Sequence, residues 1–417
     1  MITVAEASAR ILECIERMPF ETVALANAAG RVLAGGIAAP ITSPPWDNSS
    51  MDGYAVRSAD LIPGIVNGPV RLRVVAAIAA GKFAPRPLCG GEAMRIMTGA
   101  PIPEGADTVI RKEDTDEGTD TVSVGNLRDL GRNVRAAGED FRAGDALLAA
   151  GQMLRAPQLG VLASAGVRSV EVVRAPRVAI ISSGDELVEL DDFTPKLAAT
   201  KIVSSNSLTL AALVREAGGE PVYLGIARDD PENLRELLEQ GRGCDLIVTS
   251  AGLSVGDHDH VRGVFEALGG KLGFWRVRMR PGAPLAFGTL GRIPWIGLSG
   301  NPVSAIVTFE VFVRPAIRKM LGLSRLFRQT IPVRVEEPIT LNASLMHFLR
   351  AFVVRADDGS YAANLAGAQS SAVLTSLARA NALLILPGDK STIEAGETHR
   401  AMPLGDDLDL SDELRLT

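Results

Sequence analysis

Short apolar runs alternate with amphipathic segments between residues 177 and 321, and this pattern constrains the fold more than any other feature. The runs have the length of buried strands, whereas the segments have the length and period of helices. Strands are predicted at 178–182, 222–226, 246–249 and 295–298, and helices at 207–217, 231–240, 261–268 and 303–321. This order predicts a parallel sheet with helices on both faces. Ligands of such sheets bind beyond the carboxyl ends of the strands.

The segments on either side have different textures. Residues 3–18 place apolar side chains on one helical face, with Thr3 and Glu6 spaced as a capping box and Pro19 expected to end the helix. Dense proline and glycine with short alternating runs at 40–145 indicate a β-rich module. Residues 157–173 look helical and then strand-like, and residues 328–404 return to short strands and turns. The fold class is therefore a multidomain α/β and β protein.

Length and composition limit the class of protein. A chain of 417 residues exceeds the ~250–300 residues that one core usually spans, so several domains are expected. Hydrophobic residues at 47% with 22% charged residues are typical of a soluble globular protein, and a net charge of −6 argues against nucleic-acid binding. The apolar runs are shorter than the ~20 residues of a membrane span. Three separated cysteines and an N-terminus without a signal-peptide pattern predict a cytoplasmic protein without a zinc or iron–sulfur framework.

A loop rich in small residues follows the third predicted strand of the α/β region. Its residues Gly252, Ser254 and Gly256 would let backbone N–H groups approach an anion closely at the start of the next helix. The carboxylates of Asp257 and Asp259 follow, and they would repel a bare anion unless a divalent cation lay between them. The loop therefore predicts a phosphate–metal site, although an aspartate near a helix start also commonly caps the helix.

Other carboxylates occupy equivalent positions. Glu186, Asp229, Asp257 and Asp259 each come just after a predicted strand of one parallel sheet, so they are expected on one edge of that sheet. Several carboxylates that converge repel one another without a cation. Each residue alone is more readily interpreted as a helix cap, but together they favour a Mg²⁺ site.

A second anion site is predicted after the last strand of this region. Asn301 suits the N-cap position and Pro302 the first turn of the next helix, whose free N–H groups could bind an anion together with Gly300 and Ser304. Three arginines at alternate positions precede it, on one face of a predicted strand: Arg276, Arg278 and Arg280. Such a stripe is usually a solvated face, but beside anion-binding loops it could neutralise phosphate or an oxyanion.

A serine hydrolase is an alternative interpretation of the same loop. Residues 252–256 match G-x-S-x-G, the nucleophile elbow of α/β-hydrolases, with Ser254 as nucleophile and His347 or His399 as base. Against this hypothesis, Asp257 and Asp259 would surround an oxyanion hole with negative charge.

Seven motifs together resemble one known family. They are D-N-S-S-M-D-G-Y-A at 47–55, M-T-G-A-P at 97–101, P-E-G-A-D at 103–107, G-E-D at 138–140, S-G-D-E-L at 183–187, S-V-G-D at 254–257 and G-N-P-V-S at 300–304. In this order, over roughly 1–404, the chain resembles molybdopterin molybdenumtransferases of the MoeA/gephyrin E-domain family. The combination is specific, although each motif alone is not.

The resemblance implies four domains: a helical and extended domain I (1–42 and 143–175), a β-rich domain II (43–142), an α/β molybdopterin-binding domain III (176–326) and a β-barrel-like domain IV (327–404), followed by a tail (405–417).

The resemblance also implies a defined chemistry. Molybdate would be inserted into adenylylated molybdopterin (adenylyl-molybdopterin), with Mg²⁺-dependent cleavage of the phosphoanhydride and release of AMP, to give the molybdenum cofactor. The resemblance also implies a homodimer whose clefts are completed by the partner's second domain, and exchange with a molybdopterin adenylyltransferase and with proteins that mature molybdoenzymes. The implied catalytic residues are Asp52, Thr98, Asp140, Glu186, Asp229, Arg280 and Ser371. The implied cofactor-binding residues are Gly252, Ser254, Gly256, Gly300, Asn301, Pro302, Ser304 and Arg276, and the implied metal ligands are Asp257, Asp259 and Glu186.

Several positions depart from the family pattern. The chain has Ala251, Leu253 and His258 where the family usually has glycine, valine and tyrosine. The usual K-P-G-K-P is R-P-G-A-P at 280–284, so that Ala283 replaces a lysine, and Ser299 replaces a proline. A missing cation at Ala283 is expected to weaken anion binding. The departures favour a diverged paralogue as the alternative, with weak or no activity, a different oxyanion or a different pterin.

Overall fold

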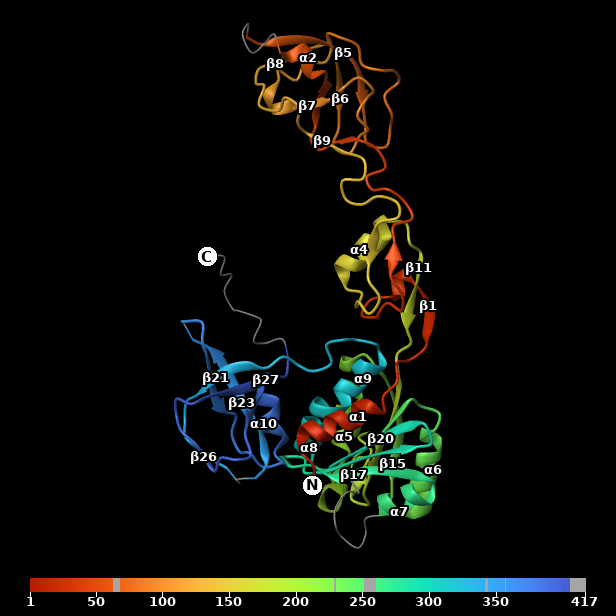
Figure 1. Cartoon of the computed structure of the whole chain (residues 1–417), viewed down its shortest axis with the longest axis vertical. Coiled ribbons are helices and arrows are strands. Elements are labelled where there is room, and N and C mark those ends of the chain that lie inside the picture. The colour runs from red at the N-terminus through yellow and green to blue at the C-terminus, as the bar shows by residue number, and fades with distance from the viewer. Residues whose placement is uncertain (63–67, 229, 251–259, 342–343, 357, 406–417) are drawn as a thin grey trace. The chain divides into compact units, whose positions relative to one another are not determined.

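The computed structural model describes residues 1–62, 68–228, 230–250, 260–341, 344–356 and 358–405 (Figure 1). The chain divides into two compact units, one formed by Met1–Glu21 with Val173–Thr417 and the other by Thr22–Val172. The first unit contains the α/β region and the C-terminal strands, and the second contains the β-rich module.

A six-stranded sheet forms the centre of the first unit. Its strands lie in the order β15 (Glu220–Ala227), β12 (Arg177–Ser183), β16 (Leu246–Ser250), β20 (Ile293–Leu298), β19 (Pro284–Leu290) and β17 (Gly270–Arg276). The first four strands are parallel, as predicted, whereas β19 and β17 are antiparallel. Only Gly291 and Arg292 separate β19 from β20, and so short a connection joins antiparallel neighbours. The sheet is therefore mixed at this edge.

Helices cover both faces of this sheet, as predicted (Figure 1). On one side lie α6 (Pro231–Gly241) and α7 (His260–Ala267), and on the other lie α5 (Ser205–Ala217) and the helical run α8 (Pro302–Thr308), η4 (Phe309–Val313) and α9 (Arg314–Met320). Buried leucines of α6 and Phe265 of α7 pack against Trp295 of β20 in one core cluster. Burial of such large apolar side chains fixes the strand ends that carry the polar residues.

The first helix, α1 (Val4–Glu13), packs on α9 and begins with the predicted capping box between Thr3 and Glu6. It ends at Glu13, so the prediction that Pro19 ends it was wrong. The reason is tertiary: the N–H of Met18 donates to the Met320 carbonyl at 2.8 Å, which holds this backbone outside the helix.

A buried ion-pair cluster joins the helical run to the segment that follows it. The Glu310 carboxylate accepts hydrogen bonds from Arg314 at 2.7 and 2.8 Å and from Arg328 at 2.7 Å. The side chains of Glu310 and Arg314 are only 2% and 7% exposed. Because neither charge can be hydrated there, each is stabilised by the opposite charge of its partner.

The C-terminal strands form a closed five-stranded barrel, as predicted. The strands are β21 (Ile331–Val335), β23 (Met346–Arg355), β24 (Tyr361–Leu365), β25 (Ala382–Leu386) and β27 (Thr398–Pro403), and pairing of β23 with β25 closes the barrel. Alternate side chains such as Val333, Leu349 and Leu384 fill its core. A short strand of the α/β region, β18 (Met279–Arg280), pairs with β23 and thereby joins the barrel to the α/β region.

The second unit is built around a five-stranded sheet, which confirms the predicted β-rich module. Its order is β7 (Thr108–Arg111), β4 (Gly53–Val56), β6 (Glu92–Ile96), β5 (Val70–Ile78) and β8 (Thr121–Val124). The rest of this unit contains α4 (Ala156–Ser164), the pair β2 (Ile37–Ala38) with β10 (Ala146–Leu148) and most of the pair β1 (Phe20–Ala24) with β11 (Ser169–Val173). Leu33, Leu154 and Leu162 are buried in its small core.

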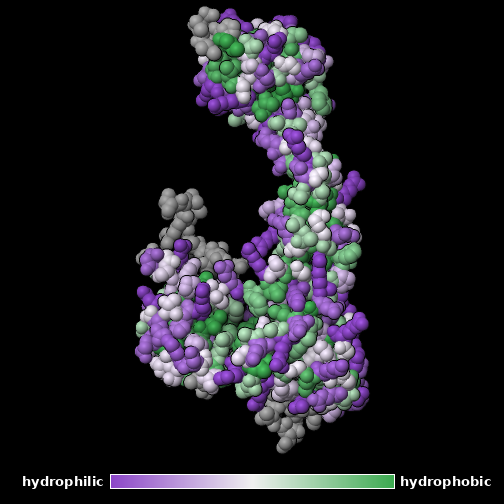
Figure 2. Space-filling model, viewed as in Figure 1, coloured by the Kyte–Doolittle hydropathy of each residue, from purple (hydrophilic) through white to green (hydrophobic). Residues whose placement is uncertain are grey.

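Short elements complete the fold. They are η1 (Leu25–Asn27), α2 (Ser58–Leu61), η2 (Lys112–Asp114), η3 (Leu197–Ala199), α10 (Leu374–Arg379) and the pairs β3 (Asn48–Ser49) with β9 (Val134–Arg135), β13 (Leu187–Val188) with β14 (Ile202–Val203) and β22 (Ile339–Thr340) with β26 (Thr392–Ile393). Among the described helices, none combines the length and hydropathy that crossing a membrane requires. Hydrophilic and hydrophobic residues are interspersed over the visible face of the barrel (Figure 2).

Candidate active site

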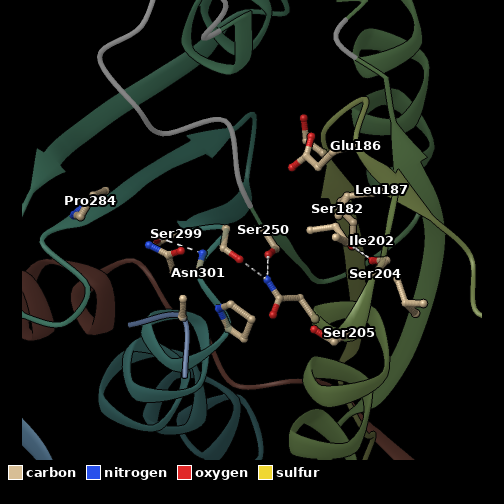
Figure 3. Close-up of a pocket in the computed structure, with 16 residues that line it drawn as sticks. Ser182, Glu186, Leu187, Ile202, Ser204, Ser205, Ser250, Pro284, Ser299 and Asn301 are labelled. Atoms are coloured by element: carbon tan, nitrogen blue, oxygen red, sulfur yellow. Dashed lines mark hydrogen bonds between the residues drawn. The ribbon is translucent and has the colours of Figure 1, made fainter. Parts of the chain in front are cut away.

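The carboxyl ends of β12, β16 and β20 surround a cleft of about 630 Å³ (Figure 3). This is the position expected for a ligand site in a parallel sheet. Hydroxyl groups dominate its polar lining, and the serines concerned are Ser182, Ser183, Ser204, Ser205, Ser250 and Ser299. Hydroxyls both donate and accept hydrogen bonds, so such a cleft suits a ligand rich in oxygen and nitrogen.

Glu186 is the one acidic residue among the described residues that line the cleft. It follows β12 through Gly184, whose φ of 141° lies in the region that favours glycine. A Cβ at Gly184 would collide with the Glu186 carboxyl group. The backbone carbonyl of Glu186 accepts from Ile202 at 2.9 Å, which fixes its place in the turn. The backbone of Glu186 is therefore fixed at the strand end, as predicted, and its side chain is exposed (Figure 3).

A hydrogen-bond network ties the strand ends together. The amide nitrogen Nδ2 of Asn206 donates to Ser250 Oγ at 2.6 Å and to the Gly300 carbonyl at 2.8 Å. The Ser204 hydroxyl donates to Ser182 Oγ at 2.9 Å. The start of α5 is thus joined to the ends of β12 and β16 and to the turn after β20. Ser204, Ser205 and Asn206 were not among the residues predicted for the site, although a polar run before a helix was a usable signal.

The predicted turn at 300–304 is present, with a difference. Asn301 is the N-cap and Pro302 the first residue of α8, and Gly300, Asn301 and Pro302 line the cleft. However, the N–H of Val303 donates to the Ser371 carbonyl at 3.2 Å, so this N–H is not free for an anion. Ser304 is buried, and the described lining of the cleft does not include it. The same contact brings the Ser371 segment of the barrel to the cleft, where Ala372 contributes to the lining.

Arg350 of β23 holds this segment from inside the barrel, and the sequence analysis missed it. Its side chain is fully buried and donates to the carbonyls of Ala368 and Ser370 at 2.9 and 3.0 Å and to Ser376 Oγ at 3.1 Å. No described carboxylate pairs with it, and burial lowers its pKa. A buried arginine that binds two carbonyls of one loop and a hydroxyl of the helix after it, α10, restrains that loop.

The three arginines do not share one strand, contrary to the prediction. Arg276 ends β17 and pairs with β19, whereas Arg280 lies in β18 and pairs with His347 of the barrel. Between them, the N–H of Ile2 donates to the Arg276 carbonyl and the N–H of Arg278 donates to the Ile2 carbonyl. Exposed and buried side chains still alternate along residues 276–280, because all three arginines are exposed and Val277 and Met279 between them are buried. The described lining of the cleft includes none of the three.

Asp52, Thr98 and Asp140 lie in the second unit. The Asp52 carboxylate accepts from the Thr98 N–H at 2.8 Å and from its hydroxyl at 2.9 Å. These bonds, with smaller contributions from the charges of Lys112 and Arg95, hold the pKa of Asp52 below its ordinary value. The structure therefore brings Asp52 and Thr98 together. Asp140 is exposed in a loop, where its N–H donates to the Ser43 carbonyl at 3.1 Å.

Several predicted site residues lie outside the described residues. They are Asp229, Gly252, Ser254, Gly256, Asp257 and Asp259. The proposed phosphate loop, two of the three proposed metal ligands and the hydrolase nucleophile are among them. Over the described part of the chain, no group of three or more histidine, cysteine, aspartate or glutamate side chains is arranged to hold a metal ion.

Three family models match successive parts of the chain. They are the MoeA N-terminal region (domains I and II) at residues 2–166, a probable molybdopterin-binding domain at 179–319 and the MoeA C-terminal region (domain IV) at 332–404. The molybdopterin molybdenumtransferase of a Nostoc species is 39% identical over 386 residues, which cover 90% of this chain and 87% of that protein. The Haemophilus influenzae protein of that name is 34% identical over 412 residues, covering 95% and 97%. The crystal structure of a molybdopterin biosynthesis MoeA protein from Pyrococcus horikoshii matches with a TM-score of 0.80 at 29% identity, covering 97% of this chain and 99% of that one.

Proposed function

This chain belongs to the MoeA family of molybdopterin molybdenumtransferases, enzymes of molybdenum cofactor biosynthesis, and we propose that it carries out a reaction in two parts. Adenylylated molybdopterin is cleaved at its phosphoanhydride with release of AMP, and molybdate is inserted into the dithiolene. The observation that supports this most is the hydroxyl-lined cleft at the carboxyl ends of β12, β16 and β20.

Different residues of the cleft have different roles in this proposal. Serine hydroxyls at the ends of β12 and β16 orient phosphate oxygens by hydrogen bonds, in a site that is already organised before the ligand binds. The Ser371 segment closes one side of the cleft, held by Arg350 and by the bond from Val303. Positioning of this kind accelerates a reaction because reacting groups no longer have to be ordered.

We propose that Glu186 shares a Mg²⁺ ion with Asp257 and Asp259. Carboxylate and hydroxyl oxygens, the donors found at this strand end, are the ligands that Mg²⁺ prefers. The bound ion would offset negative charge on the phosphoanhydride. Glu186 supports the assignment because its side chain is exposed and lines the cleft.

The direct test is the release of AMP by the purified chain from adenylylated molybdopterin, with Mg²⁺ and with a chelator. We expect release with Mg²⁺ and none with the chelator, restored when excess Mg²⁺ is added back. A chain that binds the pterin but releases no AMP under any of these conditions would instead be the non-catalytic paralogue. Labelling of Ser254 by a fluorophosphonate would support the hydrolase alternative.

We also propose a cytoplasmic homodimer with shared clefts, in which Asp52, Thr98 and Asp140 of one subunit serve the cleft of the other. Such a protein would receive its substrate from a molybdopterin adenylyltransferase and pass the product to proteins that mature molybdoenzymes. The cluster of Asp52 and Thr98 supports the proposal, because it is an organised polar site on the unit that does not contain the cleft.

Mixing two inactive variants tests the shared cleft. Asp52→Ala and Glu186→Ala each damage every cleft of their own homodimer, but a heterodimer of the two carries one cleft without a substitution. After unfolding and refolding together, the mixture is expected to recover about a quarter of wild-type activity, since about half the dimers are mixed. The measurement is AMP release, with each variant refolded alone as control. A monomeric mass by light scattering at micromolar concentration, or no recovery, would contradict the shared cleft.

Ala283 stands where the family usually has a lysine, and the effect of this difference on anion binding can be tested. It is half-buried, its carbonyl accepts from the Val277 N–H at 3.1 Å, and the next residue, Pro284, lines the cleft. Ala283→Lys is therefore expected to lower the molybdate concentration for half-maximal rate about fivefold, as a partly solvated cation contributes ~1 kcal/mol. Most of this gain should disappear at high salt.

The matched control is Ala198→Lys, which adds the same charge at an exposed position outside the described lining of the cleft. Titration of the rate against molybdate for all three proteins decides the matter. An unchanged or poorer response of Ala283→Lys would mean that Arg276, Arg278 or Arg280 already neutralises the ligand.

A further inference from the structure

The structure leaves one polar atom in the cleft wall without a partner. Asn206 is 8% exposed and lines the cleft, and its Oδ1 accepts no hydrogen bond from any described group. An unpaired buried acceptor lowers stability, so its presence in a native structure needs an explanation. We explain it by the hydrogen bonds that the Nδ2 group of the same amide donates.

The orientation of that amide is set by its neighbours. Nδ2 lies 2.8 Å from the Gly300 carbonyl, which can only accept, so the nitrogen rather than the oxygen must face it. The same Nδ2 donates to Ser250 Oγ at 2.6 Å. One NH₂ group therefore spans the end of β16 and the turn before α8, and this arrangement turns Oδ1 away from both.

We propose that Asn206 is a positioning residue that fixes the end of β16 against the Gly300 turn, so that the two walls of the cleft hold the oxyanion-bearing ligand at the correct spacing. A side chain with a single donor hydrogen, such as serine, could not donate to both sites at once. This inference rests on the proposed function and adds to it a residue that acts through Ser250 and Gly300.

Substitutions separate this role from a contribution to stability alone. Asn206→Ala removes both bonds and is expected to lower kcat for AMP release about tenfold or more, with a smaller change in KM, because misplaced walls act mainly on the transition state. Thr209→Ala is the matched control. It removes a bond within α5, from Thr209 Oγ1 to the Ser205 carbonyl, that does not reach β16 or the Gly300 turn. It should leave kcat unchanged.

Asn206→Asp gives a readout that a purely structural role would not produce. As a carboxylate it presents oxygen to the Gly300 carbonyl and repels it, whereas as a carboxylic acid it can donate to that carbonyl as the amide does. The same repulsion raises the pKa of the introduced group. The ratio of Asn206→Asp activity to wild-type activity should therefore rise as pH falls from 8 to 5.5, while the Asn206→Ala ratio stays flat. Glu186, the one acid in the described lining, is present in all three proteins and cancels in these ratios.

Other outcomes would overturn the positioning role alone, or the positioning role together with the proposed function. If wild type releases AMP but Asn206→Ala is equally active, or both variants show the same pH-independent loss, the positioning role is overturned and the proposed function stands. If wild type releases no AMP, both are overturned. AMP binding measured by calorimetry is expected to weaken less than kcat in Asn206→Ala, and an equal loss in both would also contradict positioning.

Discussion

Glu186→Gln is expected to slow AMP release about a hundredfold while leaving the unfolding midpoint almost unchanged. The substitution keeps the shape of the side chain and removes a charge that the account assigns to Mg²⁺ and the phosphoanhydride, where loss of one preorganised electrostatic contact typically costs that much. The free energy of unfolding should change by less than about 0.5 kcal/mol, because the side chain is exposed. The measurement is the rate of AMP release against Mg²⁺ concentration.

Asp191→Asn is the matched control for that experiment. It removes the same charge from an exposed position in the segment that follows β12, outside the described lining of the cleft. It should retain nearly full activity. Equal activity of Glu186→Gln and wild type at every Mg²⁺ concentration would remove Glu186 from the proposed metal site.

Of the substitutions proposed here, Glu310→Gln is expected to lower stability most, by about 3–5 kcal/mol in the free energy of unfolding of the α/β region. The neutral amide would leave the buried guanidinium of Arg314 without its internal counter-charge, and breaking a buried ion pair from one side typically costs this amount. Arg314 retains a contact with Glu216 at 3.2 Å, but that glutamate is 58% exposed and compensates poorly. Urea unfolding followed by the fluorescence of the two tryptophans of this region, Trp275 and Trp295, measures the change.

An exposed ion pair of the same region provides the comparison. Glu239→Gln breaks the Arg242–Glu239 pair at the C-terminal end of α6, whose side chains are 37% and 47% exposed, and should cost less than about 1 kcal/mol. If the two substitutions shift the urea midpoint equally, the buried cluster does not have the energetic role assigned to it.

The sequence predicted best those elements whose pattern is local. The strand β12 and the helix α6 have uninterrupted periodicity, and the Thr3–Glu6 capping box involves residues three positions apart. The carboxyl edge of the sheet followed from strand order alone, so Glu186 could be assigned to the cleft before its contacts were known. The boundaries of the four domains remain a prediction.

Features that are set by contacts between distant segments were either not predicted or predicted wrongly. The end of α1 is set by a bond to Met320, and the separation of Arg276 from Arg280 is set by strands of two different sheets. Arg350 reaches the cleft region only through a loop that its own strand does not contain. In each case the deciding partner lies far along the chain or in another sheet, and periodicity within one segment carries no information about it.

Formation of the molybdenum cofactor itself is the most direct measurement. The purified chain is incubated with adenylylated molybdopterin, molybdate and Mg²⁺, and AMP release and reconstitution of an apo-molybdoenzyme are followed in the same sample. We expect about one active cofactor for each AMP released, and formation of both products about a hundredfold slower in Glu186→Gln. Release of AMP without active cofactor, or active cofactor at the wild-type rate in that variant, would contradict this account.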